Sequence, residues 1–373
     1  MNPSANQPFA DIPVSPGGHF AILLYAALYR LLDHLRRLGR TRGESLETTF
    51  ERYPFLAGYF AELRQRMPED ISWERGLDWW RRESIAWAGQ RRAHLPLNAL
   101  EHRLGLDFRC RLALLLIGLV EEDSRFGTLF ADLQGSMHRP TLELIGRILG
   151  EGGPGERDPW KLCQPLLAGG LVEAPNRQAP RSQWLLQVPA PVWDALKGQS
   201  ESRPLEGCRH YPQTTLMTLE ELIFPQDFLQ QLQQVPALLA AGRIRVLVLR
   251  GDPGSEPLAV LGAVATALEL GLLALEDPAG VETTGWRTVA ALCTLYRCLP
   301  VLHYDPGPGE TVRLPDLNSY KGPIGVILGQ EGGLTGASLA GMLTLPLPFP
   351  TLALRSRHWQ RALDGQTSTD LES

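Results

Sequence analysis

The second half of the sequence alternates segments patterned as buried strands with segments patterned as helices. Short runs of leucine, isoleucine and valine are separated by longer apolar stretches at helical spacing. Strands are expected at 243–249, 272–275, 300–304, 325–328 and 342–347, and helices at 219–239, 258–270 and 288–298. This alternation is typical of a parallel sheet wrapped by helices, in which ligands bind at the carboxyl ends of the strands.

The loop after the first of these strands has the outline of a phosphate-binding P-loop. In the working form, G-x-x-x-x-G-K-[ST], backbone N–H groups hold the phosphates, the lysine neutralises their charge and the hydroxyl binds magnesium. Gly251 and Gly254 are present here. Glu256, Pro257 and Leu258 stand at the positions of the second glycine, the lysine and the hydroxyl residue. Because a carboxylate repels phosphate and proline has no N–H to donate, we interpret the loop as a degenerate nucleotide loop.

The same loop also has the composition of an ordinary turn from a strand into a helix. Asp252-Pro253-Gly254 is a common turn sequence, and Ser255 is a suitable helix N-cap. Pro257 suits the first turn of the helix that follows. The turn and the degenerate loop remain alternatives, and with either one no catalytic residue and no metal ligand is expected.

A second nucleotide motif is also eroded. In a P-loop ATPase another strand ends in acidic residues that hold magnesium and activate water. Here strand 300–304 is followed by Asp305, and Pro306 takes the place of the catalytic glutamate, while Glu310 comes too late to be presented by the strand end. Gln330, after the next strand, is the candidate sensor of a γ-phosphate. ATP hydrolysis is therefore not expected and no cofactor is predicted, with weak ATP or ADP binding through the loop backbone as the alternative.

Helical patterns dominate the first half of the sequence. Residues 1–18, rich in proline, asparagine and glycine, are expected to form a disordered tail, and 19–94 a helical region. Four tryptophans in this region have the pattern of a core cluster, with an exposed partner surface as the alternative. They are Trp73, Trp79, Trp80 and Trp87.

Residues 95–198 have the pattern of a winged-helix domain, in which helices are followed by a two-stranded ribbon. The strands are expected at 171–174 and 183–188. In a winged helix the preceding helix, 159–167, would read DNA. It carries Lys161 alone as a positive charge and starts after Asp158, so a protein contact is favoured over nucleic acid.

The remaining boundaries follow from composition. Residues 199–215 are polar and rich in proline and glycine, as in a domain linker. The α/β domain is expected over 216–365, and 366–373 is expected to be a second disordered tail.

Composition limits the class of protein. The 373 residues carry a net charge of −5, which gives no general attraction for nucleic acid or acidic lipid. The five cysteines form no C-x-x-C pair, so neither a zinc site nor a disulfide framework is predicted and a cytoplasmic location is expected. The apolar run 20–32 is interrupted by Arg30 and is too short for a membrane span.

Several segments resemble a known family. Residues 95–106, 112–134 and 139–144 look like the N-terminal winged-helix region of AAA+ ATPases found with the extracellular contractile injection systems of bacteria. Residues 219–225 and 246–254 resemble the entry to that family's ATPase core. The resemblance implies a ring-forming homo-oligomer, and as partners an active AAA+ ATPase or an injection-system component. The sequence departs from the family in its nucleotide motifs, and in ending where a helical lid or a second ATPase module would follow.

These observations predict a multidomain α and α/β protein with a helical and winged-helix first half and an AAA+-like second half without the lid. The expected function is that of a non-hydrolysing adaptor, assembly or regulatory protein of a contractile injection system. One alternative is an ATPase subunit active only with a partner. Arg355, Arg357 and Arg361, on a terminal basic helix, would then reach a neighbour's site, although a solvated helix face is the favoured explanation for them. The other is a DNA-binding regulator that uses Arg177 and Arg181 on the wing.

Overall fold

The chain forms two compact units. In the computed structural model, one unit comprises Met1–Gln199 with Ala290–Leu295 and the other comprises Ser200–Val289 with Tyr296–Ser373. We call them the helical unit and the sheet unit. The structure describes residues 8–89, 94–150, 158–251, 253–276, 278, 281, 283–317, 319–336, 341–349, 354 and 356.

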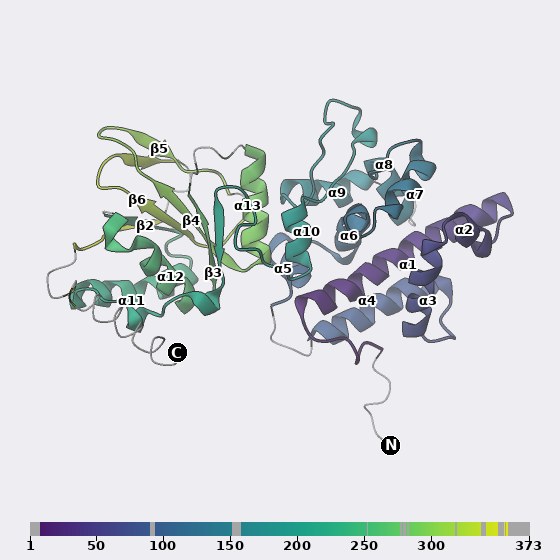
Figure 1. Ribbon diagram of the computed structural model, residues 1–373, viewed down its shortest axis with the longest axis horizontal. Helices are drawn as coiled ribbons and strands as arrows, with labels where there is room; N and C mark the ends of the chain where they lie inside the picture. The colour runs from purple at the N-terminus through teal and green to yellow at the C-terminus, as the bar shows by residue number, and fades with distance from the viewer. Residues whose placement is uncertain are drawn as a thin grey trace, which may run out of the picture. The chain divides into compact units, whose positions relative to one another are not determined.

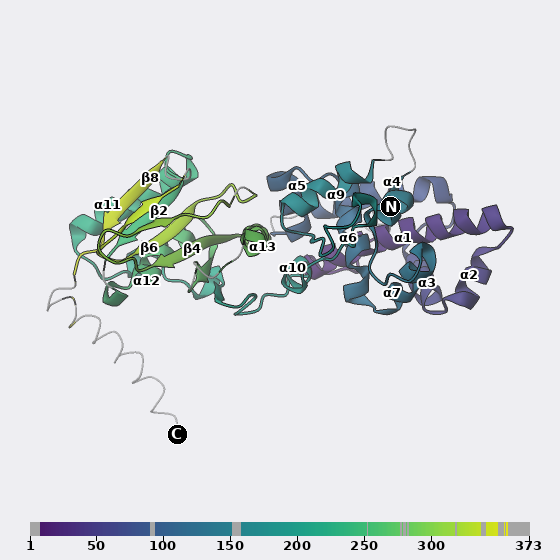
Figure 2. The same ribbon diagram turned by 90° about the horizontal axis from the view of Figure 1, so that it is seen from above.

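The helical unit is built around α1 (Pro16–Arg42), which packs against α4 and α6 (Figures 1 and 2). The side chain of Ser15 accepts a hydrogen bond from the Gly18 N–H and caps the start of α1, and Gly43 ends it in the left-handed conformation. The other helices are α2 (Leu46–Arg52), α3 (Phe55–Arg66), α4 (Trp73–Gly89), α5 (Pro96–Leu104), α6 (Phe108–Glu122), α7 (Arg125–Gln134), α8 (Leu142–Leu149), α9 (Pro159–Ala168) and α10 (Ala190–Leu196).

Residues 8–18 differ from the expected disordered tail, whereas residues 1–7 of that tail lie outside the described residues. Phe9 is 2% exposed, and its ring stacks on Trp80 with 5.0 Å between ring centroids. Trp79 and Trp80 are themselves buried, which is the core position expected for them, whereas Trp73 and Trp87 are half-buried. The apolar side chain of Phe9 therefore anchors residues that composition alone assigned to a tail.

The expected strands at 171–174 and 183–188 are wrong as regular strands. Two isolated antiparallel bridges are present, joining Glu173 to Gln187 and Thr141 to Leu185. A short 3₁₀ helix, η1 (Arg181–Gln183), occupies the start of the second segment, because the Gln183 N–H bonds to the Pro180 carbonyl. The ribbon is thus shorter than the sequence pattern predicts.

The sheet unit contains a mostly parallel, six-stranded sheet in the order β1-β3-β4-β6-β2-β8. Figure 2 shows β8, β2, β6 and β4 side by side in that order. Only β1 is antiparallel to its neighbour. The strands are β1 (Cys208–Tyr211), β2 (Val246–Arg250), β3 (Gly271–Leu275), β4 (Cys298–Tyr304), β6 (Ile324–Leu328) and β8 (Met342–Pro346).

Helices cover the sheet and close its core. The helices of this region are α11 (Gln226–Ala240), α12 (Pro257–Ala267) and the first part of α13 (Thr283–Leu295), whose residues from Ala290 on belong to the helical unit. Figure 1 shows α11 and α12 along one side of the strands, where leucines and valines from both helices pack on buried residues of the sheet. Beyond the ends of β4 and β6 the chain forms a second, two-stranded parallel ribbon of β5 (Thr311–Arg313) and β7 (Gly333–Thr335).

Two expectations for this region need correction. The segment 199–215, interpreted as a linker, contains β1, and Cys208 in that strand is buried in the sheet. The helix expected over 219–239 is two helices, η3 (Leu219–Glu221) and α11, because Pro225 lacks the N–H that would continue the first. Among the described helices, none is both long enough and apolar enough to cross a membrane.

Candidate functional site

The topology of the sheet points to the carboxyl ends of β2 and β6. From β2 the chain passes through α12 to β3, which lies beyond β6 and β4, whereas from β6 it passes to β8 on the opposite side of β2. Neighbouring strands whose connections diverge in this way open a crevice at their carboxyl ends, and ligands of α/β proteins bind there. The loop 251–258 follows β2 and therefore lies at this end of the sheet.

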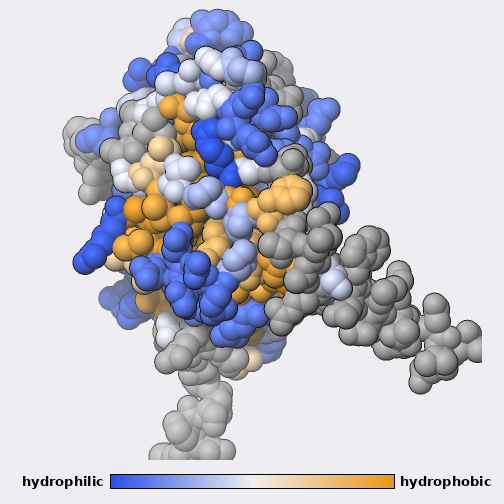
Figure 3. Space-filling view, turned by 90° about the vertical axis from the view of Figure 1, so that its left-hand side faces the viewer, coloured by the Kyte–Doolittle hydropathy of each residue, from blue (hydrophilic) through white to orange (hydrophobic). Residues whose placement is uncertain are grey.

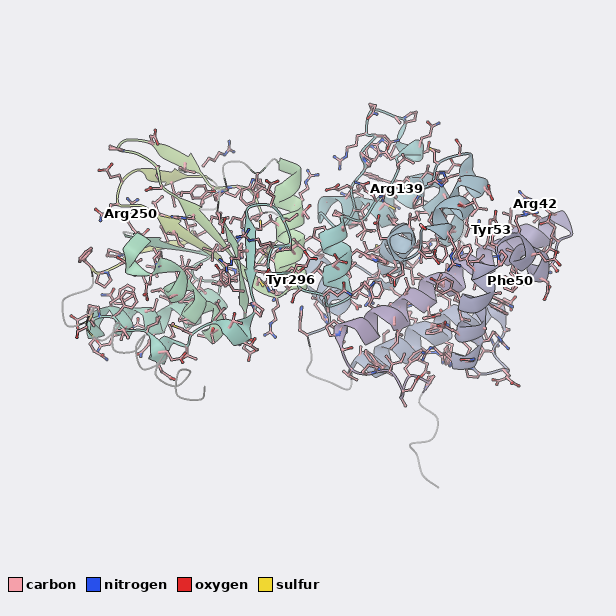
Figure 4. The ribbon with its side chains drawn as sticks, viewed as in Figure 1. Arg42, Phe50, Tyr53, Arg139, Arg250 and Tyr296 are labelled. Carbon is pink, nitrogen blue, oxygen red and sulfur yellow. The ribbon has the colours of Figure 1, made fainter. Side chains whose placement is uncertain are left out.

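Arg250, the last residue of β2, lies at the carboxyl end of that strand (Figure 4). Its guanidinium donates hydrogen bonds to the carbonyls of Gln330 (2.9 Å), Glu331 (3.4 Å) and Gly332 (3.1 Å). The planar fork of an arginine presents several donors at once, so one side chain can hold three consecutive carbonyls. The loop after β6 is in this way tied to the end of β2. We call this set of contacts the Arg250 clamp.

Gly251, the next residue, is enclosed by the backbone around it. Its N–H donates to the Leu328 carbonyl at 3.2 Å, and the Leu347 N–H donates to the Arg250 carbonyl at 2.7 Å. A Cβ atom placed on Gly251 would lie 2.8 Å from the Cβ of Leu347. Gly251 therefore provides room for the strand end after β8 rather than for a ligand.

The loop that follows leads from β2 into α12. Pro253–Ser255 forms a 3₁₀ turn in which Ser255 is 4% exposed. Glu256, with φ 53° and ψ 47°, is the N-cap, so the interpretation of Ser255 as N-cap is wrong. Pro257 is the first helical residue and has no N–H, which removes one of the donors that a helix start offers to an anion.

The other residues of the predicted loop take ordinary structural places. Gly254 is exposed, and Leu258 is half-buried against the hydrophobic core of the sheet unit. Asp252 lies outside the described residues. The exposed Glu256 leaves a negative charge at the helix start, where a nucleotide phosphate would need a positive potential.

Asp305 and Gln330 come together with Arg250 at this edge. The Asp305 carboxylate lies against the backbone of Gly329, where a Cβ atom would overlap its Oδ1, and the Gly329 N–H donates to the Tyr304 carbonyl at 3.2 Å. Gln330 follows directly, and its carbonyl is one of the three that Arg250 holds. The exposed Asp305 and the exposed Gln330 thus lie just beyond the ends of neighbouring strands.

The residues after Asp305 do not supply a catalytic base at the strand end. Pro306 packs against Gly332, whose missing side chain makes room for the proline ring. The Glu310 carboxylate accepts a hydrogen bond from the Gly307 N–H at 2.9 Å and so closes its own turn. The chain then enters the β5–β7 ribbon.

The sequence indicates this edge through Gly251, Asp305 and Gln330, which the structure brings together, but it does not indicate Arg250, which makes the principal contact. The available signal was a charged residue at the end of an otherwise apolar strand, Val-Leu-Val-Leu-Arg. Its three acceptors are about eighty positions away in the sequence, so no local pattern indicates them.

The surface at this end of the sheet is partly hydrophobic. Figure 3 views the molecule from the side on which Figure 4 labels Arg250, and it shows hydrophobic areas between polar ones. Phe349, in the segment that leaves β8, is 68% exposed.

The fold defines an α and α/β protein: the first half is helical, and the second holds a mostly parallel mixed sheet in which Arg250 ties the end of β2 to the loop after β6. No family model matches the sequence, and no curated protein matches it.

Proposed function

We propose that the protein is a non-hydrolysing AAA+-like adaptor or assembly protein. The Arg250 clamp is the observation that carries the proposal, because it joins the ends of β2 and β6 where an ATPase of this architecture would open toward nucleotide. The resemblance of residues 246–254 to the entry of an AAA+ core supports the same reading. The sheet serves as a scaffold for protein contacts in this proposal.

Electrostatics at the helix start support the loss of nucleotide chemistry. A carboxylate on the order of 5 Å from a phosphate charge costs about 3 kcal/mol at an effective dielectric constant of about 20, or about a hundredfold in affinity. The positions of the lysine and the hydroxyl, now Pro257 and Leu258, supply no compensating charge or magnesium ligand. A P-loop ATPase needs both for phosphoryl transfer.

The helical unit supports the adaptor part of the proposal. Thr141, α8, α9 and the bridged segments 171–174 and 183–188 follow one another in the order of a winged helix with a reduced ribbon. Residues 95–144 resemble the corresponding region of the injection-system ATPases. An active AAA+ ATPase or an injection-system component is the partner that this resemblance favours.

A phosphate-release assay tests the proposal. Purified protein with magnesium and ATP is expected to release phosphate at the rate of the buffer alone, and Asp305→Asn is expected to change nothing. A matched variant with Glu256→Gly, Pro257→Lys and Leu258→Thr restores the P-loop residues and shows whether the loop can accept nucleotide at all. Turnover by the unmodified protein that Asp305→Asn abolishes would overturn the proposal.

A further inference from the structure

A surface of the helical unit combines arginine and tryptophan side chains. Arg181 lies over the ring of Trp160 with 4.2 Å between its Cζ and the ring centroid, and Arg177 lies over the ring of Trp184 at 5.7 Å. The two tryptophans meet edge to face, with 5.9 Å between centroids. We call this surface the Arg–Trp loop, which comprises residues 176–184 and Trp160 at the start of α9.

Hydrogen bonds hold the Arg–Trp loop in one conformation. Asn176 bridges it, since its Nδ2 donates to the Gln183 carbonyl (3.0 Å) and its Oδ1 accepts from the Leu185 N–H (2.7 Å). The Trp184 indole N–H donates to the Ala179 carbonyl at 2.9 Å. Side chains on a preorganised loop lose little conformational freedom when they bind a partner.

Both arginines carry positive charge that the described part of the chain does not neutralise. Arg177 and Arg181 are exposed, and no carboxylate of the described residues forms an ion pair with either. Glu173, the acidic residue closest to both arginines in the sequence, accepts a hydrogen bond from Gln187, and Asp158, beside Trp160, caps α9. An arginine stacked on an aromatic ring keeps its N–H edge available for a carboxylate.

We propose that the Arg–Trp loop binds an acidic segment of a partner protein. This inference rests on the proposed adaptor function, and it specifies that the partner contributes carboxylate side chains. Stacked guanidinium groups on a rigid loop match carboxylates bidentately, and the flanking indole rings add apolar contact. Nucleic acid fits less well, because residues 141–198 carry six acidic and six basic side chains and so offer no basic field along a duplex.

Fluorescence anisotropy with the full chain and a fluorescein-labelled oligoglutamate peptide tests this proposal. The unmodified protein is expected to bind the peptide, and Arg177→Gln with Arg181→Gln is expected to weaken binding at least about tenfold. Replacement of both arginines by lysine keeps the charge but loses the planar fork, and we expect an intermediate affinity. Arg75→Gln with Arg82→Gln, two exposed arginines of α4, is the matched control with the same change in charge.

The peptide-binding results test the acidic partner independently of the proposed adaptor function. Peptide binding that is lost with Arg177 and Arg181 and kept in the control supports the acidic partner, whatever the nucleotide assays show. An absence of peptide binding, or equal loss in the control, overturns it. Tighter binding of labelled duplex DNA through the same two arginines also overturns it, and would make the loop a nucleic-acid surface.

Discussion

A single residue, Arg250, determines the backbone arrangement at the candidate site more than the predicted motifs do. The predicted landmarks Gly251, Asp305 and Gln330 come to one edge of the sheet, but Arg250 determines how that edge is closed. A strand ending in arginine has the same local pattern whether the side chain binds solvent, a phosphate or a distant carbonyl. The contact depends on strand order, which sequence periodicity does not contain.

Removal of the Arg250 clamp is expected to loosen the loop after β6. Hydrogen bonds from a charged donor contribute about 1.5–3 kcal/mol when they are well sheltered, and less at a half-exposed site. In Arg250→Ala we therefore expect amide hydrogen exchange at residues 329–333 to rise about tenfold. The control Arg203→Ala changes an exposed arginine of the same unit and is expected to leave exchange there unchanged. Equal protection in Arg250→Ala would show that the clamp does not hold the loop.

His19 is expected to make the stability of the helical unit depend on pH. Burial, with a further contribution from Arg111, lowers the pKa of His19 to about 3, and the ring stacks on Trp87. The unfolded chain, with a pKa near the ordinary value of about 6.5, then binds more protons than the folded chain. The stabilisation is therefore complete above about pH 6.5 and is lost as pH falls from about 6.5 toward 3.

Urea unfolding at two pH values measures this dependence. Between pH 7 and pH 5 the His19 contribution is expected to fall by about 2 kcal/mol, and His19→Phe should remove that part of the slope. His138→Gln, at an exposed histidine of the same unit, should keep it. An identical slope in the unmodified protein and in His19→Phe would assign the pH dependence to other groups.

The sequence predicts those helices and strands that local residue patterns determine. The apolar strands and most helices are found close to their expected ranges, because periodicity and capping residues determine them locally. The missed elements depend on distant partners. β1 pairs with β3, which follows more than sixty positions later in the sequence. β5 pairs with β7, although β6 lies between them in the sequence. The expected ribbon at 171–188 is reduced to isolated bridges, although its residues have strand character.

The contact between α6 and α10 tests the packing of the helical unit. Gly118 in α6 faces the ring of Trp193, and a Cβ atom at Gly118 would overlap that ring. Gly118→Ala is expected to destabilise the unit by about 1–3 kcal/mol, although alanine is the better helix former by about 1 kcal/mol. Gly58→Ala in α3 is the matched control, since nothing lies within 4 Å of its new Cβ, and it should be neutral or stabilising. Thermal unfolding of both variants gives the comparison, and a Gly118→Ala variant as stable as Gly58→Ala would contradict the packing.

At the scale of the whole molecule, composition and pattern predicted the character of each half. A helical first half and a mostly parallel sheet in the second half are confirmed. The winged-helix and AAA+ assignments remain proposals that rest on the order of elements and on the resemblance. The prediction of a disordered tail was wrong at Phe9, because its ring stacks on Trp80, about seventy positions later in the sequence. The composition around Phe9, rich in proline and asparagine, does not indicate this contact.

Calorimetric titration with ATP and ADP, with and without magnesium, tests the proposal that the sheet unit keeps the scaffold of a nucleotide-binding fold without its binding chemistry. With the Arg250 clamp in place and Glu256 at the start of α12, no heat of binding is expected at millimolar nucleotide. Binding that magnesium strengthens would contradict the claim and would make the protein a nucleotide-dependent subunit.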